Sequence, residues 1–306
     1  MPDPLVLERF TDTDVAAVRA LADAVEAETG TSPFGEVTWT GLRGRGTLGD
    51  RGVLLADGGG DADAYVHLAH HRRGEWSAEV AARRGHEDAL PDLLATGIDR
   101  VRGDGGGHVT LWLHGDVDLP DGGADLGFVL ERELLEMRVP LPLAEAPAWP
   151  PGVTVRTFVV GQDEDEWLEV NNRAFEGHPE QGGWTRGTIE QREQADWFDA
   201  GGFLLAFDAD GLAGSCWTKV HPADPPKEPV ARGEIYAIGA DPSRQGRGLG
   251  RALTIGGLES LAERDITLGM LFVDAANEAA VGLYRSLGFV THRVDRAYGL
   301  TVPWSG

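Results

Sequence analysis

The fold is decided by a stretch in the second half of the chain, which reads Glu234-Ile-Tyr-Ala-Ile-Gly-Ala-Asp-Pro-Ser-Arg-Gln-Gly-Arg-Gly-Leu-Gly-Arg-Ala-Leu253. Its first residues form an apolar run that indicates a strand, which Asp241-Pro242 ends. The glycines that follow let backbone N–H groups turn inward and approach a ligand closely. A helix begins directly after them, and the free N–H groups and positive dipole at its start favour an anion. We therefore expect an anion cradle of the size of a pyrophosphate between this strand and this helix.

The residues of the loop exclude two known types of phosphate-binding loop and leave a third. A phosphate loop of the Gly-x4-Gly-Lys-Ser/Thr type is excluded, because no lysine follows a glycine here. The dinucleotide pattern Gly-x-Gly-x-x-Gly also fails, because an arginine occupies its last position. The pattern that remains is Gln-x-x-Gly-x-Gly, formed by Gln245, Gly248 and Gly250. The loop also carries three positive charges, those of Arg244, Arg247 and Arg251.

This pattern resembles the acetyl-CoA loop of the GNAT N-acetyltransferases. A second stretch, Asn277-Glu-Ala-Ala-Val-Gly-Leu-Tyr-Arg-Ser-Leu-Gly-Phe289, is similar to that family's Asn-x-x-Ala-x-x-x-Tyr-x-x-x-Gly-Phe signature. The two stretches stand in the family's order, separated by a helix and a strand. The resemblance implies an α/β (α+β) fold in which a mixed, mostly antiparallel sheet is flanked by helices. It also implies acetyl-CoA as co-substrate and no metal.

Short segments recur in both halves of the chain. Gly52-Val-Leu-Leu-Ala56 recurs as Gly202-Phe-Leu-Leu-Ala206, and Gly127-Phe-Val129 recurs as Gly288-Phe-Val290. Their common order predicts two copies of one α/β unit. Five prolines between residues 140 and 152 indicate a linker, because they sustain neither a helix nor a central strand. We expect an N-terminal GNAT-like, non-catalytic domain at 1–140, a linker at 141–152 and a catalytic domain at 153–306.

Several further stretches resemble the mycothiol synthases, a two-domain branch of the GNAT family. They are the segments 170–184 and 214–221, the strand and loop from Glu234, and the helix that carries Tyr284. The resemblance implies transfer of an acetyl group from acetyl-CoA to the cysteinyl amine of cysteinyl-glucosaminyl-inositol. Two alternatives stay open: an acetyltransferase for another amine (a peptide N-terminus, an aminoglycoside or a polyamine), and a non-catalytic acyl-CoA-binding protein.

Acetyl transfer to an amine needs a base and an acid. Glu234, at the start of the strand, can take the proton of the amine directly or through water. Tyr284 can protonate the leaving thiolate, because a phenol stays protonated near neutral pH. Gly239 would permit a bulge before the loop, which would free donors for the tetrahedral intermediate.

The resemblance implies the same two catalytic residues and further contacts. The implied substrate contacts are Glu36, Glu180, Lys219, Glu234 and Tyr284. The implied acetyl-CoA contacts are Ile238, Gly239, Ala240, Gln245, Gly246, Arg247, Gly248, Leu249, Gly250, Arg251, Phe289, Val290, Thr291, His292, Arg293 and Val294.

The first half departs from the family where its own cradle should lie. Its stretch Glu79-Val-Ala-Ala-Arg-Arg-Gly-His-Glu-Asp-Ala89 has one glycine and places Glu87 and Asp88 where phosphates would bind. Two carboxylates repel a pyrophosphate. We therefore expect this half to have lost CoA binding or to bind it weakly.

The amino-acid composition disfavours two classes of binding partner. With 27 Lys and Arg against 50 Asp and Glu, the 306 residues carry a formal charge of −23, which disfavours nucleic acid and anionic membranes as partners. No apolar run suits a membrane span, and the start of the chain lacks the pattern of a signal peptide. We expect a cytoplasmic monomer that acts on a small molecule.

We interpret the single cysteine, Cys216, as a small buried residue. We interpret the acidic runs 131–136 and 163–166 as solvated helix faces.

Overall fold

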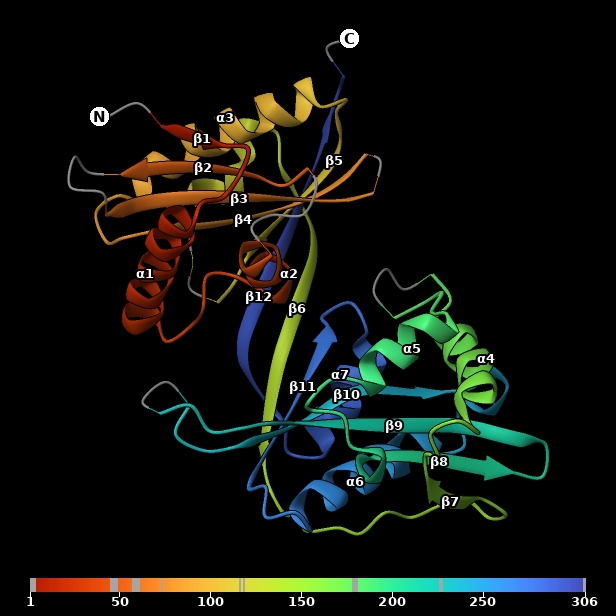
Figure 1. Cartoon of the computed structure of the whole chain (residues 1–306). Coiled ribbons are helices and arrows are strands. Elements are labelled where there is room, and N and C mark those ends of the chain that lie inside the picture. The colour runs from red at the N-terminus through yellow and green to blue at the C-terminus, as the bar shows by residue number, and fades with distance from the viewer. Residues whose placement is uncertain are drawn as a thin grey trace. The chain divides into compact units, whose positions relative to one another are not determined.

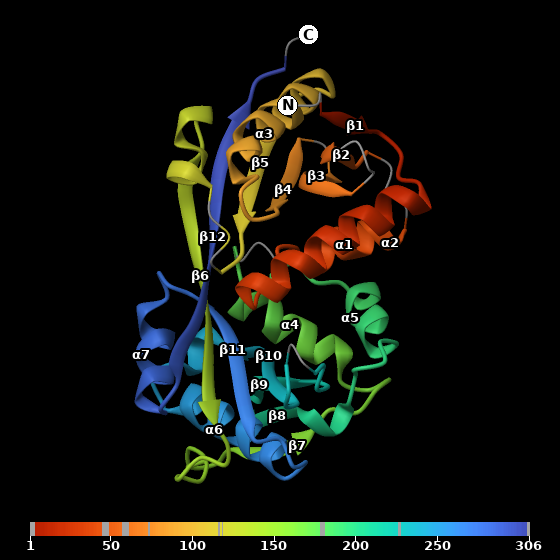
Figure 2. The same ribbon diagram turned by 90° about the vertical axis from the view of Figure 1, so that its left-hand side faces the viewer.

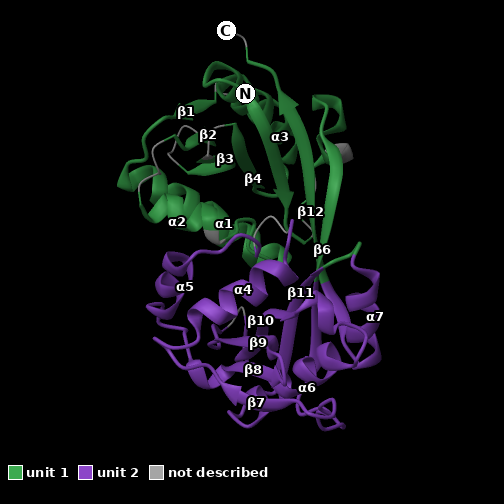
Figure 3. Ribbon diagram, turned by 90° about the vertical axis from the view of Figure 1, so that its right-hand side faces the viewer, with its two compact units in different colours: residues 1–135, 274–276, 293–306 green, residues 136–273, 277–292 purple. Residues whose placement is uncertain are grey.

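The structure, a computed structural model, describes residues 4–44, 49–56, 61–72, 74–115, 117, 119–177, 181–225 and 228–304. These residues form two compact units (Figure 3). Unit 1 comprises residues 1–135, 274–276 and 293–306, and unit 2 comprises residues 136–273 and 277–292. The domain boundaries expected around the proline-rich segment stay a prediction.

Unit 1 has the strand order β1-β2-β3-β4-β5-β12-β6, in which the pairs β1–β2, β2–β3, β3–β4 and β5–β12 are antiparallel and β4 runs parallel to β5. Its elements, labelled in Figure 1, are β1 (Leu5–Leu7), α1 (Asp12–Thr29), α2 (Glu36–Arg43), β2 (Arg51–Ala56), β3 (Ala62–Arg72), β4 (Glu75–Ala82), η1 (Glu87–Ala89), α3 (Leu90–Gly103), β5 (Gly107–Leu113), η2 (Pro120–Leu126), most of β6 (Val129–Pro140) and most of β12 (Val290–Val302).

Helices cover both faces of the unit 1 sheet (Figure 2). Leu90, Leu94 and Ile98 of α3 pack with Val53 and Val66 on one face. The apolar side of α1 and α2 packs on the other face, where the buried side chains are Val18, Leu21, Ala22, Val25, Phe34, Leu42, Leu54, Tyr65 and Ala81. The spacing of the apolar residues of α1, three or four apart, explains why one side of that helix is buried.

Unit 2 repeats this arrangement, with the strand order β6-β11-β10-β9-β8-β7 and a parallel pair formed by β10 and β11. Its elements are β7 (Thr154–Thr157), α4 (Glu164–Ala174), α5 (Arg186–Glu193), η3 (Ala200–Gly202), β8 (Phe203–Asp208), β9 (Gly211–His221), β10 (Arg232–Ala240), η4 (Pro242–Arg244), α6 (Leu249–Ala262), β11 (Leu268–Asp274) and α7 (Glu278–Ser286).

One face of the unit 2 sheet carries an aromatic cluster under α4 and α5. Trp217 of β9 is fully buried and stacks on Phe203 with ring centroids 4.5 Å apart, and Trp167 of α4 meets it edge to face. The opposite face carries α6. There Gly257 allows a close approach, because an added Cβ would lie 2.4 Å from the sulfur of Cys216. Burial raises the pKa of this thiol to about 12, which fits the expected inert residue.

Two long strands belong to both units. β6 contributes residues 129–135 to unit 1 and 136–140 to unit 2, and β12 contributes residues 290–292 to unit 2 and 293–302 to unit 1. Within unit 1, β12 pairs antiparallel with β5, from Arg296 opposite Leu113 to Val302 opposite Gly107. No sequence pattern indicated that the last residues of the chain would complete the sheet of unit 1.

The interpretation of the run 131–136 as a solvated helix face is wrong, and for the run 163–166 it holds only for Asp165 and Glu166, which are exposed on α4. Residues 131–136 lie in strand β6, and Glu136 is buried there and ion-paired with Arg138 at 2.6 Å. Asp163 and Glu164, at the start of α4, are also buried. Arg156 pairs with Asp163, and the bond from Arg156 lowers the pKa of that carboxyl despite its burial. Arg138, two positions from Glu136, and Arg156, seven positions from Asp163, supply the positive charges that allow these two carboxylates to be buried.

Candidate functional site

Strands β10 and β11 part where the candidate site begins. Their parallel pairing runs from Gly233 opposite Gly269 to Ile235 opposite Leu271, whereas β10 continues to Ala240. The carbonyl of Tyr236 accepts a bond from the side chain of Gln181, and residues 237–240 have no strand paired with them on the β11 side among the described residues. An extended ligand could add to this edge through main-chain hydrogen bonds.

The bulge in β10 lies at Tyr236 and not at Gly239, where the sequence had suggested it. The register with β9 shifts between Ile235 and Ala237, and it is regular from Ala237 to Ala240. Gly239 has a packing role instead, because an added Cβ would lie 3.1 Å from Ala174 and from the ring of Phe175 at the end of α4.

The glycine loop forms an open cradle. Gly246 and Gly248 adopt left-handed φ angles of 78° and 82°, and an added Cβ at either of them or at Gly250 would meet no atom within 4 Å. Gly248 caps α6 without any side-chain bond. The N–H of Ala252 bonds the carbonyl of Gly248 at 3.1 Å, so the three preceding N–H groups lie ahead of the hydrogen-bond ladder of the helix. The arrangement matches the expected anion site.

The three arginines of the loop differ in their partners. Arg244 bonds Asp208 and Ser243 and lies 3.4 Å from Asp241, and the Asp208 bond raises its pKa. Arg251 bonds Glu145 of the proline-rich segment at 2.5 Å and Ser286 of α7 at 2.8 Å. Arg247 is exposed and makes no hydrogen bond or ion pair with the described residues. Only Arg247 therefore offers its guanidinium to a ligand without first giving up a partner.

Asp241 fixes the start of the loop. It accepts bonds from the N–H and hydroxyl of Ser243, and Arg173 of α4 donates to it at 2.8 Å. These bonds, led by that from the Ser243 hydroxyl, hold the pKa of Asp241 far below its usual range despite its burial. The carboxylate thus stays charged and ties the loop to α4.

Glu234 and Lys219 lie opposite each other on β10 and β9. Glu234 is buried, and one of its oxygens, Oε2, lies 2.6 Å from Nε2 of His221. Lys219 makes no ion pair with a described carboxylate. Its ammonium lies over the rings of Trp197, at 4.7 Å, and Tyr236, at 5.5 Å. The structure therefore groups these side chains on one face of two strands, the face that carries α4 and α5.

Tyr284 lies on α7 and is buried, with its ring 5.7 Å from that of Phe289. Burial, together with the nearby Cys216, raises the pKa of this phenol well above its usual value. The hydroxyl thus stays protonated at neutral pH and keeps a proton to donate. No contact between Tyr284 and Glu234 occurs among the described residues.

The remaining predicted residues fall in several places. Glu180 and the side chain of Glu36 lie outside the described residues; the backbone of Glu36 begins α2 of unit 1. Residues 289–292 follow α7 in unit 2, with Phe289 buried and Val290 exposed. Arg293 and Val294 belong to unit 1, where Arg293 pairs with Asp295 at 3.0 Å.

The corresponding loop of unit 1 is occupied by its own side chain. The N–H of Gly85, which has a φ of 88°, donates to the carboxylate of Glu87 at 2.7 Å. Pro91 in the first turn of α3 removes one backbone donor. Pairing of β4 with β5 extends from Glu75 to Glu79, and β4 itself continues to Ala82.

Glu79 of β4 is also saturated by internal bonds. The N–H of Gly35 lies 3.0 and 3.1 Å from its two oxygens, and the ring of His114 lies 2.7 Å from Oε1. The other ring nitrogen of His114 lies 3.2 Å from Asp295. Burial alone would lower the pKa of His114, but the bonds to Asp295 and Glu79 outweigh it and raise the pKa to about 9. This triad is a structural ion cluster without an open oxygen on Glu79.

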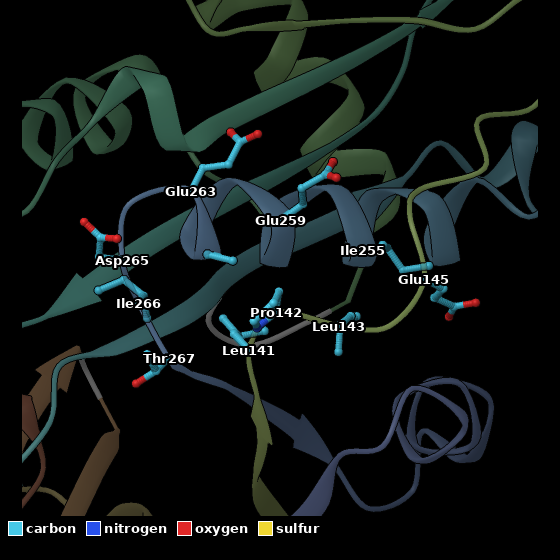
Figure 4. Close-up of a pocket in the computed structure, with 11 residues that line it drawn as sticks. Leu141, Pro142, Leu143, Glu145, Ile255, Glu259, Glu263, Asp265, Ile266 and Thr267 are labelled. Atoms are coloured by element: carbon cyan, nitrogen blue, oxygen red, sulfur yellow. The ribbon is translucent and has the colours of Figure 1, made fainter.

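A shallow cleft of about 490 Å³ lies along the second half of α6, away from the cradle at the start of that helix. Figure 4 shows Leu141, Pro142 and Ile266 beside it, with the carboxylates of Glu259 and Glu263 on the helix. None of the residues predicted to bind substrate or acetyl-CoA lines it.

Comparison with known proteins identifies the family. The chain is 45% identical to the mycothiol acetyltransferase of Thermobispora bispora, over 95% of this chain and 97% of that protein. The chain belongs to the mycothiol acetyltransferases. It is 41% identical to the mycothiol acetyltransferase of Thermomonospora curvata, over 96% of both chains. The family model for the acetyltransferase (GNAT) family matches residues 165–289, which lie in unit 2 apart from residues 274–276.

Solved structures share the fold. A GCN5-related N-acetyltransferase from Sphaerobacter thermophilus matches 99% of the chain with a TM-score of 0.75 and 23% identity. A tandem GNAT protein from the clavulanic acid biosynthesis pathway matches 99% with a TM-score of 0.69 and 17% identity. The chain is thus an acetyltransferase with the expected α/β GNAT fold, and acetyltransferases of this family use acetyl-CoA.

Sequence reasoning missed His221 as a partner of Glu234, although it had named the stretch that ends in His221. The sequence did hold a signal for this partner. Alternate residues of a strand lie on the same face, so His221, two positions after Lys219, lies on the face that carries Lys219.

Among the described residues, no group of three His, Cys, Asp or Glu side chains is placed to hold a metal ion. Within the same residues, no helix has the length and apolar character to cross a membrane.

Proposed function

We propose that this acetyltransferase transfers the acetyl group of acetyl-CoA to the cysteinyl amine of cysteinyl-glucosaminyl-inositol, giving mycothiol and CoA. The observation that carries the proposal is the open glycine cradle at the end of a strand that starts with Glu234. The kinship with proteins named mycothiol acetyltransferase supports the choice of acceptor.

The cradle binds the pyrophosphate of acetyl-CoA in this proposal. The N–H groups at the start of α6 donate to the phosphates, and Arg247 adds a charge. The edge of residues 237–240 that β11 leaves open takes the extended arm of the co-substrate, which leads the thioester toward Glu234. The remaining predicted acetyl-CoA contacts, from Phe289 to Val294, belong to the same proposal.

Glu234 then acts as the general base and Tyr284 as the general acid. The amine loses a proton to Glu234, attacks the thioester carbon, and forms a tetrahedral intermediate. That intermediate collapses with loss of the CoA sulfur, which takes the proton of the Tyr284 hydroxyl. Burial keeps this phenol protonated until the thiolate forms. Lys219 and Glu180 are proposed acceptor contacts of unit 2, and Glu36 is a separate proposed contact of unit 1.

The test compares acceptors by titrating the thiol that is newly released from acetyl-CoA. With cysteinyl-glucosaminyl-inositol, release should be much faster than with a peptide amine, an aminoglycoside or a polyamine. Faster release with one of these amines would replace the proposed acceptor. Absence of release with every amine would favour a non-catalytic acyl-CoA-binding protein.

Unit 1 has no catalytic role and no CoA site in this proposal. The carboxylate of Glu87 already bonds the backbone N–H of Gly85, and Glu79 is saturated by Gly35 and His114. We further propose that the protein works as a cytoplasmic monomer on a small molecule, without nucleic acid, membrane or metal. The net charge of −23 supports the absence of a nucleic-acid partner.

A further inference from the structure

Among the residues that the structure describes, the carboxylate of Glu234 has one polar partner, His221. Oε2 lies 2.6 Å from Nε2 of the ring, and the exposed fractions of the two side chains are 10% and 28%. Glu234 is on β10 and His221 is the last residue of β9, two positions beyond Lys219 on the same face. The two side chains therefore come from different strands, and the pairing of β9 with β10 determines the distance between them.

The other charged groups that face this pair are held elsewhere. The ammonium of Lys219, directly across from Glu234, lies over Trp197 and Tyr236. Arg232, which lies across from His221, bonds Glu228 at 3.0 Å. Neither cation forms an ion pair with Glu234 among the described residues.

The direction of the hydrogen bond follows from the chemistry of the groups. An ionised carboxylate only accepts, so Nε2 of His221 must carry the proton of this bond in either charge state of the ring. Oε2 is thereby occupied, while Oε1 makes no hydrogen bond to a described residue. Glu79 of unit 1 offers the contrast, because Gly35 and His114 engage both of its oxygens.

We infer that His221 is a positioning residue, which holds Oε2 of Glu234 so that Oε1 faces the amine of the acceptor. The inference rests on the proposed role of Glu234 as base and adds a residue to it. A histidine bonded to a carboxylate orients both groups. Displacement of a catalytic group by about 1 Å can cost 100-fold in rate, so loss of His221 should act on turnover and leave CoA binding unchanged.

The kinetic test is a double-mutant cycle with the amine that the wild-type protein acetylates fastest. His221→Phe should lower kcat by about 100-fold with the Kd for CoA unchanged, and His221→Gln, which keeps an N–H donor, should recover at least about tenfold of that loss. In a Glu234→Gln background, His221→Phe should lower kcat no further. His108→Phe is the control, since it removes an exposed histidine–glutamate pair of unit 1. An equal fall of kcat in both backgrounds would overturn the inference.

A second measurement needs no acceptor. Nitrogen-15 NMR of the histidine rings should show Nε2 of His221 protonated, with a resonance that moves in Glu234→Gln and stays in place in His108→Phe. A bare Nε2, or a resonance unmoved by Glu234→Gln, would overturn the inference. Failure of the proposed function would show differently, as an absence of CoA release by the wild-type protein with the proposed acceptor.

Discussion

The place of the anion on α6 can be tested with a single methyl group. Gly250 of α6 and Gly282 of α7 are both helical glycines at which an added Cβ would meet no atom within 4 Å. Alanine is favoured over glycine in a helix by up to about 1 kcal/mol. Gly250→Ala and Gly282→Ala should therefore each raise the free energy of unfolding of the free protein. A gain of that size raises the melting temperature by roughly 2–4 °C in a unit of about 150 residues.

The Gly250→Ala and Gly282→Ala variants should differ in their affinity for CoA. In the proposed complex the pyrophosphate lies against the N–H groups at the start of α6, so a methyl group at 250 takes its space and one at 282 does not. Loss of one hydrogen bond to a charged group costs about 1.5–3 kcal/mol, which weakens Kd by about 10- to 100-fold. Titration calorimetry with CoA measures the difference. Equal, wild-type Kd values for both variants would refute the placement of the anion.

Four further predictions concern the rest of the chain. Glu234→Gln should lower kcat by about 10²- to 10⁴-fold with CoA affinity nearly intact; a large loss of CoA binding would contradict its role as base. Tyr284→Phe should slow turnover to a similar extent, and an unchanged rate would remove it as acid. Calorimetry should find one CoA per chain, because Glu87 occupies the loop of unit 1; two would show a second site. The raised pKa of His114, about 9 against 6.5 in the unfolded chain, stabilises the fold below pH 6.5, and this contribution disappears as the pH rises through 9. The stability gap between wild type and His114→Gln should thus narrow by at most about 3 kcal/mol between pH 6 and pH 10, and an equal gap in denaturant unfolding at both values would contradict a charged His114.

Sequence patterns predicted the local parts of the fold. The helix expected directly after the glycine loop is α6, and the helix expected to carry Tyr284 is α7, where the side chain of Asn277 accepts a bond from the N–H of Ala280. Both depend on caps, glycines and apolar spacing, which act between neighbouring residues. The same holds for the glycine loop, whose left-handed residues only glycine adopts easily.

Features that depend on distant partners could not be predicted in this way. Arg251 is held by Glu145, more than a hundred positions away, and Arg132 bonds Asp274, which lies in a different strand. The bulge at Tyr236 follows from the pairing of β9 with β10, which no single stretch reveals. His221 likewise becomes a partner of Glu234 only through that pairing.

Because β6 and β12 each contribute residues to both units, the two halves of the chain should not fold well when they are expressed separately. A chain cut within the proline-rich segment would take residues 293–302 from unit 1 and leave β5 with one edge unpaired. It would also take residues 136–140 from unit 2. An unpaired strand edge invites aggregation, so neither half should be obtained as a well-behaved protein. This exchange of strand segments makes each unit depend on the other for a complete sheet, whether or not unit 1 binds a ligand of its own.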